Sequence, residues 1–343
     1  MVARPRLKEQ FRPLRRGHGQ VQLGLDPAVG VVLEGLTDDE IRLLERLDGS
    51  LDETAATAWA VRRGIPAGRV ADLLQTLRDH ALTVESPAHR LDLAGLAPPL
   101  RDALRPDAAA LACAYRSSDD GYAVLGRRAR RRVVVSGTGG LPTVLVQAMR
   151  QAGVGHVLTG RYADDAPTGV TAPDLVVLVG VGALDAEAGS RWRRGRVPHL
   201  PVVLHGTCAE VGPLVVPGAG PCLRCLDLTR ADHDPGWPAV LAQLTPEAVG
   251  PARDASGETS LVFATAGVAA MTALAALDGH PHPPGTSFRI GLPVPRLTEQ
   301  VWPVHPQCGC GGAGAERRCD DAELVRSGAP ERGSPPPSAT MVG

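Results

Sequence analysis

The first 85 residues carry a pattern of apolar positions that predicts a small α+β unit. Val21, Leu23 and Leu25 alternate with other residues, and a turn at Asp26-Pro27 leads into a second apolar run ending near Leu33, as in a β-hairpin. The next predicted elements are a helix that starts at a Thr37/Glu40 capping box, helices over 52–63 and from Pro66, and a short strand over 82–85. This order is typical of a winged-helix-like module, which we place at residues 1–88.

A Pro/Ala-rich stretch follows and predicts a helical connector over residues 89–130, with a helix near 107–115. The connector runs into the basic stretch Arg127–Arg132, which is interrupted by Ala129. We interpret this stretch as the solvated end of a helix, where positive charge complements the helix dipole, in preference to a phosphate site.

From residue 131 the pattern changes to buried strands that alternate with apolar helices. Strands are predicted over 133–135, 156–159, 174–180, 197–205 and 209–216. Leu261–Leu277 has no charges, but it is Ala-rich and slightly short for a membrane span, so we predict a buried core helix. The predicted fold class is α/β, a Rossmann-like domain with a mostly parallel sheet over 131–312, preceded by the winged-helix-like α+β domain. Residues 313–343 are rich in Gly, Pro, Ser and charge and predict a disordered tail.

A glycine turn after the first strand of the α/β domain is a candidate nucleotide site. Gly137, Gly139 and Gly140 would let backbone N–H groups and a helix N-terminus approach a phosphate. Pro142 stands where the dinucleotide-binding pattern has its third glycine, and no acidic residue ends the second strand to hold a ribose. Arg161 in that region leaves an NADP site open, because an arginine can bind the 2′-phosphate.

Two cysteine pairs are the clearest chemical signal. Cys222 and Cys225 lie three positions apart, a spacing that lets two thiolates face one tetrahedral ion, and Cys308 and Cys310 offer a second pair. Redox proteins also use C-x-x-C, but there it normally starts a helix of a thioredoxin-like unit, which the flanking sequence does not predict. We therefore predict a structural Zn²⁺ bound by four sulfurs.

Composition restricts the partners and the compartment. The 343 residues suffice for two domains, and they are 43% hydrophobic but 3% aromatic, so Ala, Val and Leu must fill the cores. A net charge of -1 argues against nucleic acid and against an anionic membrane as partners. The first residues lack the apolar segment of a secretory signal, and seven cysteines, an odd number, favour metal ligation in a reducing compartment. We therefore expect a cytoplasmic protein.

The second half of the chain resembles the ThiF/MoeB family of ubiquitin-like protein activating enzymes. The resemblance spans roughly residues 131–312 and rests on GTGGL after a strand, PHLPVVLHGT, GPLVVPGAGPCLRC, a long Ala-rich helix and a terminal cysteine pair. More narrowly, the chain is similar to the ThiF-like partner proteins of thiazole/oxazole-modified peptide pathways. The resemblance implies a Rossmann-like fold, and it implies pairing of two chains in a homodimer, as is common in the family.

The chain departs from the active members of that family at the positions that bind ATP. Those members use a ribose-binding Asp, an Arg and Lys clamp, and an Asp that coordinates magnesium. This chain reads Leu178–Gly182 at the magnesium position, and the nearest acid is Asp185. Without these groups phosphoryl chemistry loses its electrostatic stabilisation, so we predict no ATP turnover by this chain alone. Cys208 beside His205 is an alternative nucleophile, but we interpret Cys208 as a small residue near a strand end.

The N-terminal segment, from RPRLKEQFRPLRRG through TVE, resembles the PqqD-like peptide recognition element of enzymes that mature ribosomally made peptides. In that family the leader peptide adds as a strand beside the hairpin and packs against the third helix, a form of strand addition. By this resemblance the peptide-binding residues would be Val31, Val32, Leu33 and Glu34 of the hairpin and Val70, Leu73, Leu74 and Leu77 of the third helix.

Together these observations predict a scaffold that binds the leader of a precursor peptide and presents the peptide to a separate YcaO-type cyclodehydratase. Two alternatives stay open. The chain would be a true ThiF-type adenylyltransferase that activates a small carrier protein, or a DNA-binding regulator that uses its winged-helix-like module, against which the near-neutral charge argues.

Overall fold

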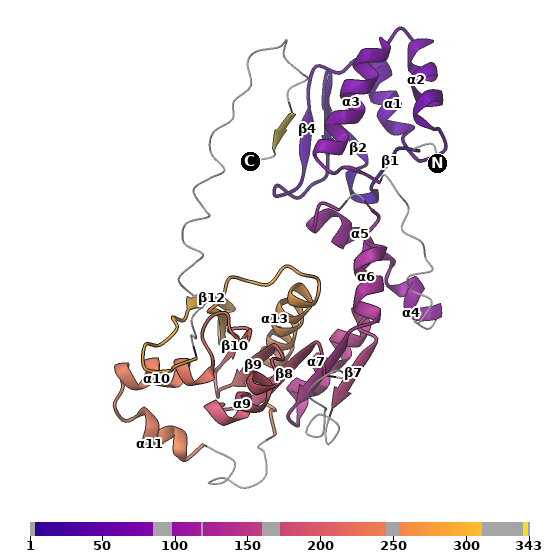
Figure 1. Ribbon diagram of the computed structural model, residues 1–343. Helices are drawn as coiled ribbons and strands as arrows, with labels where there is room; N and C mark the ends of the chain where they lie inside the picture. Colours follow the sequence, from indigo (N-terminus) through magenta and orange to yellow (C-terminus); the bar gives the residue numbers. More distant parts are fainter. Residues whose placement is uncertain are drawn as a thin grey trace. The chain divides into compact units, whose positions relative to one another are not determined.

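The computed structural model describes residues 4–84, 98–117, 119–159, 172–244, 254–310 and 339–341. The chain divides into two compact units, one of Met1–Arg127 with Gly328–Gly343 and one of Arg128–Ser327 (Figure 1). The connector that we predicted as a separate segment therefore belongs largely to the first unit, where its helices are α4 (Pro98–Ala103), α5 (Arg105–Ala114) and most of α6 (Tyr122–Ala129).

The first unit combines small antiparallel sheets with a group of short helices. Its strands are β1 (Arg6–Leu7), β2 (Pro13–Gly17), β3 (Gln20–Leu23), β4 (Val31–Leu33) and β5 (Thr83–Val84), and its helices are η1 (Glu9–Phe11), α1 (Asp38–Glu45), α2 (Glu53–Val61) and α3 (Ala67–Asp79). The predicted hairpin is the antiparallel pair β3 and β4, and the three predicted helices are present. We did not predict β1 and β2, because neither carries an alternating apolar pattern; β1 pairs with β5, and β2 extends the hairpin.

Helix starts in this unit follow the capping residues of the sequence. The backbone N–H of Glu40 donates to the Thr37 hydroxyl, and the Glu40 carboxylate accepts from the Thr37 backbone N–H at 2.7 Å. Asp52 accepts from the Ala55 N–H at 2.8 Å and caps α2. The capping box predicted from Thr37 and Glu40 is therefore confirmed, and the helices pack an aliphatic core against the sheet.

A strand from the other end of the chain completes the hairpin sheet. β13 (Ala339–Met341) pairs antiparallel with β4, and the sheet order is β13-β4-β3-β2. These three residues belong to the tail over 313–343 that we expected to be disordered, and their backbone is paired. The other residues of that tail lie outside the described part of the chain.

The second unit is built on a seven-stranded mixed sheet. Its strands are β6 (Arg132–Ser136), β7 (His156–Thr159), β8 (Leu175–Val181), β9 (His199–Leu204), β10 (Cys208–Val211), β11 (Thr286–Gly291) and β12 (Arg296–Val301), in the order β12-β11-β10-β9-β8-β6-β7. The strands β7, β6, β8 and β9 run parallel, whereas β10, β11 and β12 extend the sheet by antiparallel pairs. The predicted α/β class is confirmed, and the antiparallel extension is an addition to it.

Helices cover both faces of this sheet. They are α7 (Gly140–Gln151), α9 (Ala186–Arg194), α10 (Leu223–His233), α11 (Trp237–Ala242) and α13 (Thr259–Leu277). Val133 and Val135 share one buried cluster with residues of α7 and α13, whereas the intervening Val134 joins a second cluster with residues of α9 and α10. Successive side chains of a strand point to opposite faces, so the continuous apolar run of β6 serves two layers of helices.

The apolar helix α13 is long enough to span a membrane by length and composition. Nine of its residues are buried, and Leu261, Ala266 and Ala273 belong to the main core of the sheet. The sequence-based interpretation as a core helix therefore agrees with the packing of the structure.

The basic stretch Arg127–Arg132 is only partly the solvated helix end that we expected. Arg128 is 4% exposed, and its guanidinium donates to both carboxylate oxygens of Asp278, at 2.9 Å and 2.5 Å. Arg131 forms an ion pair of 2.6 Å with Asp174. The expectation of a solvated run is wrong for Arg128, because a distant carboxylate at the end of α13 pairs with it inside the second unit.

Candidate functional site

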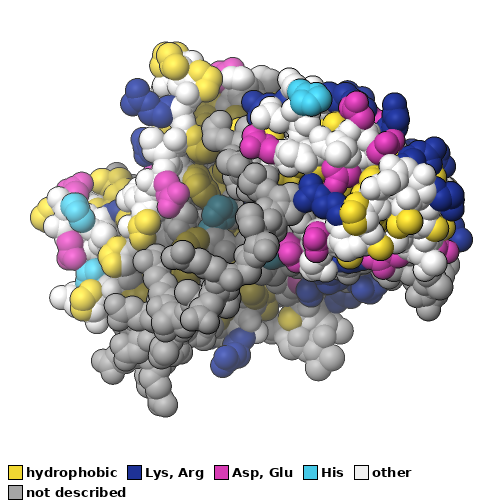
Figure 2. Space-filling view, turned by 90° about the horizontal axis from the view of Figure 1, so that it is seen from above, with side chains coloured by type: hydrophobic (Ala, Val, Ile, Leu, Met, Phe, Trp, Pro, Cys, Tyr) yellow, Lys and Arg dark blue, Asp and Glu magenta, His cyan; other side chains and the backbone are white. Residues whose placement is uncertain are grey.

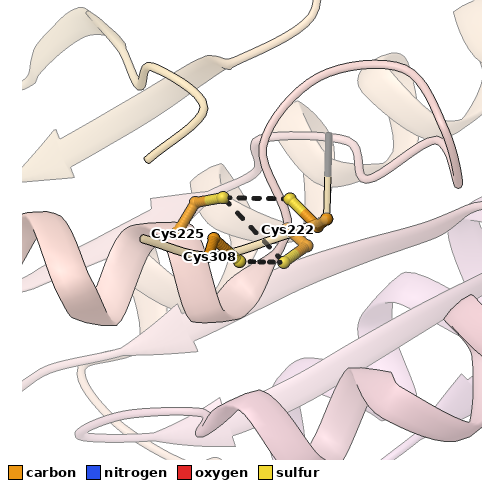
Figure 3. A group of neighbouring side chains, drawn as sticks. Cys222, Cys225 and Cys308 are labelled. Atoms are coloured by element: carbon orange, nitrogen blue, oxygen red, sulfur yellow. Dashed lines mark hydrogen bonds between the residues drawn. The ribbon is translucent and has the colours of Figure 1, made fainter. Parts of the chain in front are cut away.

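Four cysteine sulfurs converge in the second unit. The sulfur of Cys222 lies 4.0 Å from that of Cys225 and 3.5 Å from that of Cys308, and the sulfur of Cys225 lies 3.2 Å from that of Cys310. All four lie within 4.8 Å of one another, and Figure 3 shows Cys222, Cys225 and Cys308 pointing toward a common point. Sulfurs bound 2.3 Å from a tetrahedral zinc lie about 3.8 Å apart, so the cluster has the dimensions of a four-sulfur site.

Local structure brings these sulfurs together. Cys222 is the N-cap of α10 and Cys225 lies in its first turn, where unpaired N–H groups and the helix dipole favour negative charge. Cys308 and Cys310 follow β12, and the N–H of Cys308 donates to the carbonyl of His305 at 3.0 Å. Gly309 between them has φ +68°, a conformation that glycine adopts without strain.

The surroundings shift the pKa values of the cysteines in different directions. Burial raises the pKa of Cys308 to about 11, and hydrogen bonds with Cys225 and Cys222 act in the same direction. Burial, and then hydrogen bonds with the other cysteines, also raise the pKa of Cys310. For Cys225, burial opposes ionisation, but hydrogen bonds from the backbone of His305 and Cys222 outweigh it, so its pKa is lowered. A cation bound between the four sulfurs would stabilise all of them as thiolates, because its positive charge offsets their mutual repulsion, so the donor set fits a cation.

Buried imidazoles flank the cysteine cluster. His305 contacts Asp232 through Nε2 at 2.8 Å, which orients the segment that leads to Cys308. Nδ1 of His199 donates to the carbonyl of Val197 at 3.1 Å, and burial lowers the pKa of His199. Its ring borders a cavity of about 170 Å³ that is also lined by cysteines of the cluster. Burial therefore favours the neutral form of His199 beside the cluster.

The glycine turn of the candidate nucleotide site is engaged by the protein's own chain. The N–H of Gly140 donates to the Ser256 hydroxyl at 3.1 Å, and the N–H of Leu141 donates to the Ala255 carbonyl at 2.9 Å. A Cβ on Gly139 would lie 2.7 Å from the Ala255 backbone nitrogen, so this glycine allows a close approach of the chain to itself. Two N–H groups that would bind a phosphate at this turn, those of Gly140 and Leu141, are therefore occupied.

The remaining N–H positions of that first helical turn are also unavailable. Pro142 has no N–H, and the N–H of Thr143 donates to the Gly139 carbonyl at 3.4 Å. An adjoining cavity of about 460 Å³ is lined by polar and small residues, with Arg150 as its charged group among the described residues. Arg150 donates to the carbonyl of Val157 at 3.2 Å. No feature of the sequence predicted that residues 255 and 256 contact this turn.

The lysine and the acidic residue that ATP binding would need are engaged in other contacts. Lys8 is the single lysine of the chain, and its Nζ donates to the carbonyls of Ala81, Ala112 and Ser117 at 2.6, 2.9 and 2.6 Å within the first unit. Asp185, the acid nearest to the magnesium position, caps α9 by accepting from the Ala188 N–H at 3.0 Å. The glycine turn in the second unit therefore has no lysine to clamp a phosphate. Arg161 lies outside the described residues.

Cys208 does not form a catalytic pair with His205 in the structure. Cys208 is buried at 8% exposure, and its carbonyl accepts from the backbone N–H of His205 at 2.7 Å. The nearby Glu210 contacts Arg230 and Arg289, each at 3.0 Å. This placement agrees with the interpretation of Cys208 as a small residue near a strand end.

The predicted peptide-binding residues divide into two kinds of environment. On α3, the side chains of Val70, Leu73, Leu74 and Leu77 are between 0% and 3% exposed and belong to the core of the first unit. On the hairpin, Val31, Val32 and Leu33 form β4, whose backbone pairs with both β3 and β13, and Glu34 accepts from Gln20 at 3.0 Å. The backbone of β4, and not the apolar face of α3, is therefore where another strand is bound.

The arginines of α3 are held by carboxylates. Arg69 contacts Glu40 at 2.6 Å, and Arg78 pairs with Glu53. Lys and Arg side chains are interspersed with Asp and Glu on the face shown in Figure 2. Such pairing argues against α3 as a recognition helix in a DNA groove, which would need these cations for phosphates.

Comparison with known proteins gives the fold class an independent test. No protein-family model matches the sequence, and no curated protein sequence matches it. Solved structures do match, at sequence identities below 20%, a level at which the likeness concerns the fold. They include heterocyclases and E. coli MccB, so the chain shares its fold with these proteins.

Three matches illustrate the likeness. The heterocyclase TruD superposes with a TM-score of 0.63 at 19% identity, over 90% of this chain and 43% of TruD. A heterocyclase in complex with substrate and cofactor gives a TM-score of 0.61 at 17% identity, over 91% of this chain and 40% of the other. E. coli MccB with AMPCPP and MccA gives 0.64 at 14% identity, over 90% of this chain and 99% of MccB. The chain thus spans about two fifths of these heterocyclases.

Proposed function

We propose that this protein binds the leader of a ribosomal precursor peptide and presents the peptide to a separate YcaO-type cyclodehydratase. The observation that carries the proposal is the outer edge of β4, which accepts an additional antiparallel strand in the first unit. Strand addition binds a peptide through its main chain, so one edge serves peptides whose sequences vary.

The structural matches support a role in peptide modification. This chain corresponds to 40% and 43% of two heterocyclases, so a second protein would supply what the remainder of those chains supplies. One of these heterocyclases was solved with a substrate, and MccB was solved with MccA. A partner protein that delivers the peptide is consistent with both comparisons.

In this proposal the second unit is a structural platform that holds one zinc ion. Cys222 and Cys225 of α10 and Cys308 and Cys310 after β12 would bind the ion, which supplies a cross-link between segments that are distant in sequence. A closed four-sulfur site has no open position for a substrate, so the zinc would stabilise the fold and leave the chemistry to the partner enzyme.

A true adenylyltransferase is the second candidate, and the match to 99% of MccB with AMPCPP favours it. Against it stand the occupied N–H groups of Gly140 and Leu141 and the engagement of Lys8 in the first unit. Exchange of labelled pyrophosphate into ATP by the purified chain distinguishes the two candidates, because the scaffold would give no exchange.

Hydrogen exchange with and without precursor peptide tests the proposal. Candidate leader peptides from the same gene cluster are added to the full chain at micromolar concentration, with a scrambled leader as control. We expect the leader, but not the scrambled control, to slow the exchange of the amides of residues 31–34. Absence of binding by every candidate, or protection confined to the second unit, would contradict the proposal.

A further inference from the structure

The edge of β4 that would receive a peptide is already paired with the protein's own chain. The register joins Ala339 to Leu33, Thr340 to Val32 and Met341 to Val31. In Figure 1, β13 lies alongside β4 in the first unit. About three hundred positions of the sequence divide the two strands.

Only one strand can use this edge at a time. The N–H and C=O groups of a strand point alternately to its two sides, and β3 already takes one side of β4. The opposite side offers one row of groups, which β13 occupies. A guest strand and β13 are therefore alternatives for the same backbone groups.

We propose that β13 is an internal competitor for the guest strand, so that a leader peptide binds β4 by displacing Ala339–Met341. The proposal rests on the proposed function and adds a regulatory step to it. The apparent dissociation constant of the leader is its intrinsic value divided by the fraction of molecules in which the edge is open.

Two features suit β13 to this role. It is paired over only three residues, so its release breaks few hydrogen bonds and leaves the β3–β4 hairpin intact. It is also attached to the chain that it blocks, so its local concentration does not fall when the protein is diluted. A tethered, short strand blocks weak guests and yields to a guest that pairs over a longer stretch.

The sequence of the competitor indicates what kind of guest the edge accepts. Residues 338–343 read Ser-Ala-Thr-Met-Val-Gly, a stretch without charge. A guest that replaces it would run antiparallel to β4 and present an uncharged segment of small and apolar residues opposite residues 31–33. We therefore expect the recognised part of a leader to be such a segment.

The test uses a dye-labelled synthetic peptide with the sequence of residues 336–343 as the probe, and fluorescence anisotropy as the readout. Four proteins are compared: the full chain, a chain that ends at Ser327, the double variant Ala339→Pro with Thr340→Pro, and Thr340→Val. Consecutive N–H groups of a strand point to opposite sides, so two adjacent prolines remove one that faces β4 in either register. Thr340→Val keeps every N–H and is the matched control.

We expect the shortened chain and the double-proline variant to bind the probe at least tenfold more tightly than the full chain and Thr340→Val. Equal affinities in all four proteins, or no binding by the shortened chain, would overturn the proposal. Candidate leader peptides are then tested as competitors on the shortened chain. If the tail probe binds the shortened chain and no leader displaces it, the proposed function fails while the internal pairing stands. If leaders bind the full and shortened chains equally, the competitor role fails while the proposed function stands.

Discussion

Cys225 and Cys310 lie with their sulfurs 3.2 Å apart, although 85 positions separate them in the sequence. One belongs to the first turn of α10 and the other to the segment after β12. The contact closes a loop that contains α13 and two strands of the sheet. A cross-link at this point therefore restricts a large part of the unfolded second unit.

If zinc makes this cross-link, replacing a ligand should remove the ion and destabilise the chain. We expect one zinc per chain by plasma mass spectrometry, and less than a tenth of that in Cys225→Ser. The melting temperature should fall by about 10 °C, since about 3 kcal/mol corresponds to several degrees for a unit of this size. Cys208→Ser, at a buried cysteine outside the cluster, is the matched control and should keep its zinc. A full zinc content in Cys225→Ser would refute the assignment.

Breaking the buried pair of Arg128 and Asp278 should destabilise the second unit strongly. Asp278→Asn leaves a guanidinium buried without its counter-charge, which costs about 3–5 kcal/mol. Urea unfolding followed by tryptophan fluorescence measures the loss. The double variant Arg128→Met with Asp278→Leu should recover most of it, because no charge remains buried. Arg131→Met, which breaks a more exposed pair, should cost less than about 1 kcal/mol.

Glu40 should make the first unit sensitive to acid. Burial opposes its ionisation, but hydrogen bonds from Thr37 and Arg69 outweigh burial and lower its pKa in the folded chain. A carboxyl with a lowered pKa stabilises the fold above its unfolded pKa of about 4.3 and loses this contribution as the pH falls below it.

Glu40→Gln should therefore cost about 2 kcal/mol at pH 7, and the difference from the unaltered chain should shrink below about pH 4. Chemical unfolding at a series of pH values, followed by the circular dichroism of the helices, measures both quantities. Glu45→Gln removes a carboxylate from an exposed pair on the same helix and should change stability by less than about 0.5 kcal/mol. A constant effect of Glu40→Gln across this pH range would contradict the role of its charge.

ATP should leave the melting temperature unchanged. A ligand at a hundred times its dissociation constant stabilises a protein by about 2.7 kcal/mol, so binding with a constant of about 10 μM would be evident at about 1 mM Mg-ATP. We expect no such shift, because Ser256 and Ala255 occupy the N–H groups of Gly140 and Leu141 in the glycine turn. Ser256→Gly serves as a probe of this explanation, since it removes only one of the two contacts and should not create ATP binding. A clear shift in the unaltered chain would instead support the adenylyltransferase.

Much of the local structure could be predicted from the sequence because it depends on near neighbours. Thr37 and Glu40 fix a helix start by bonding each other across three positions, and the continuous apolar run over Val133–Val135 fits a strand that is covered on both faces. The C-x-x-C spacing of Cys222 and Cys225 likewise predicts two sulfurs that face one point.

Other features became visible only when distant segments were packed together. The sequence of the glycine turn predicts a phosphate site. Only the fold brings Ser256 and Ala255 to the N–H groups of Gly140 and Leu141. The basic run reads as solvated, and only the end of α13 supplies Asp278 to Arg128.

The sequence by itself therefore determined the class of the fold, the helix starts and the cysteine pairs, since these follow from spacing and period along the chain. Tertiary structure decided which polar groups are already engaged and which strand lies at the edge of β4. The reason is physical: backbone N–H and C=O groups are the same at every residue, so the sequence does not mark their partners, and a hydrogen bond between them depends only on which segments meet in space.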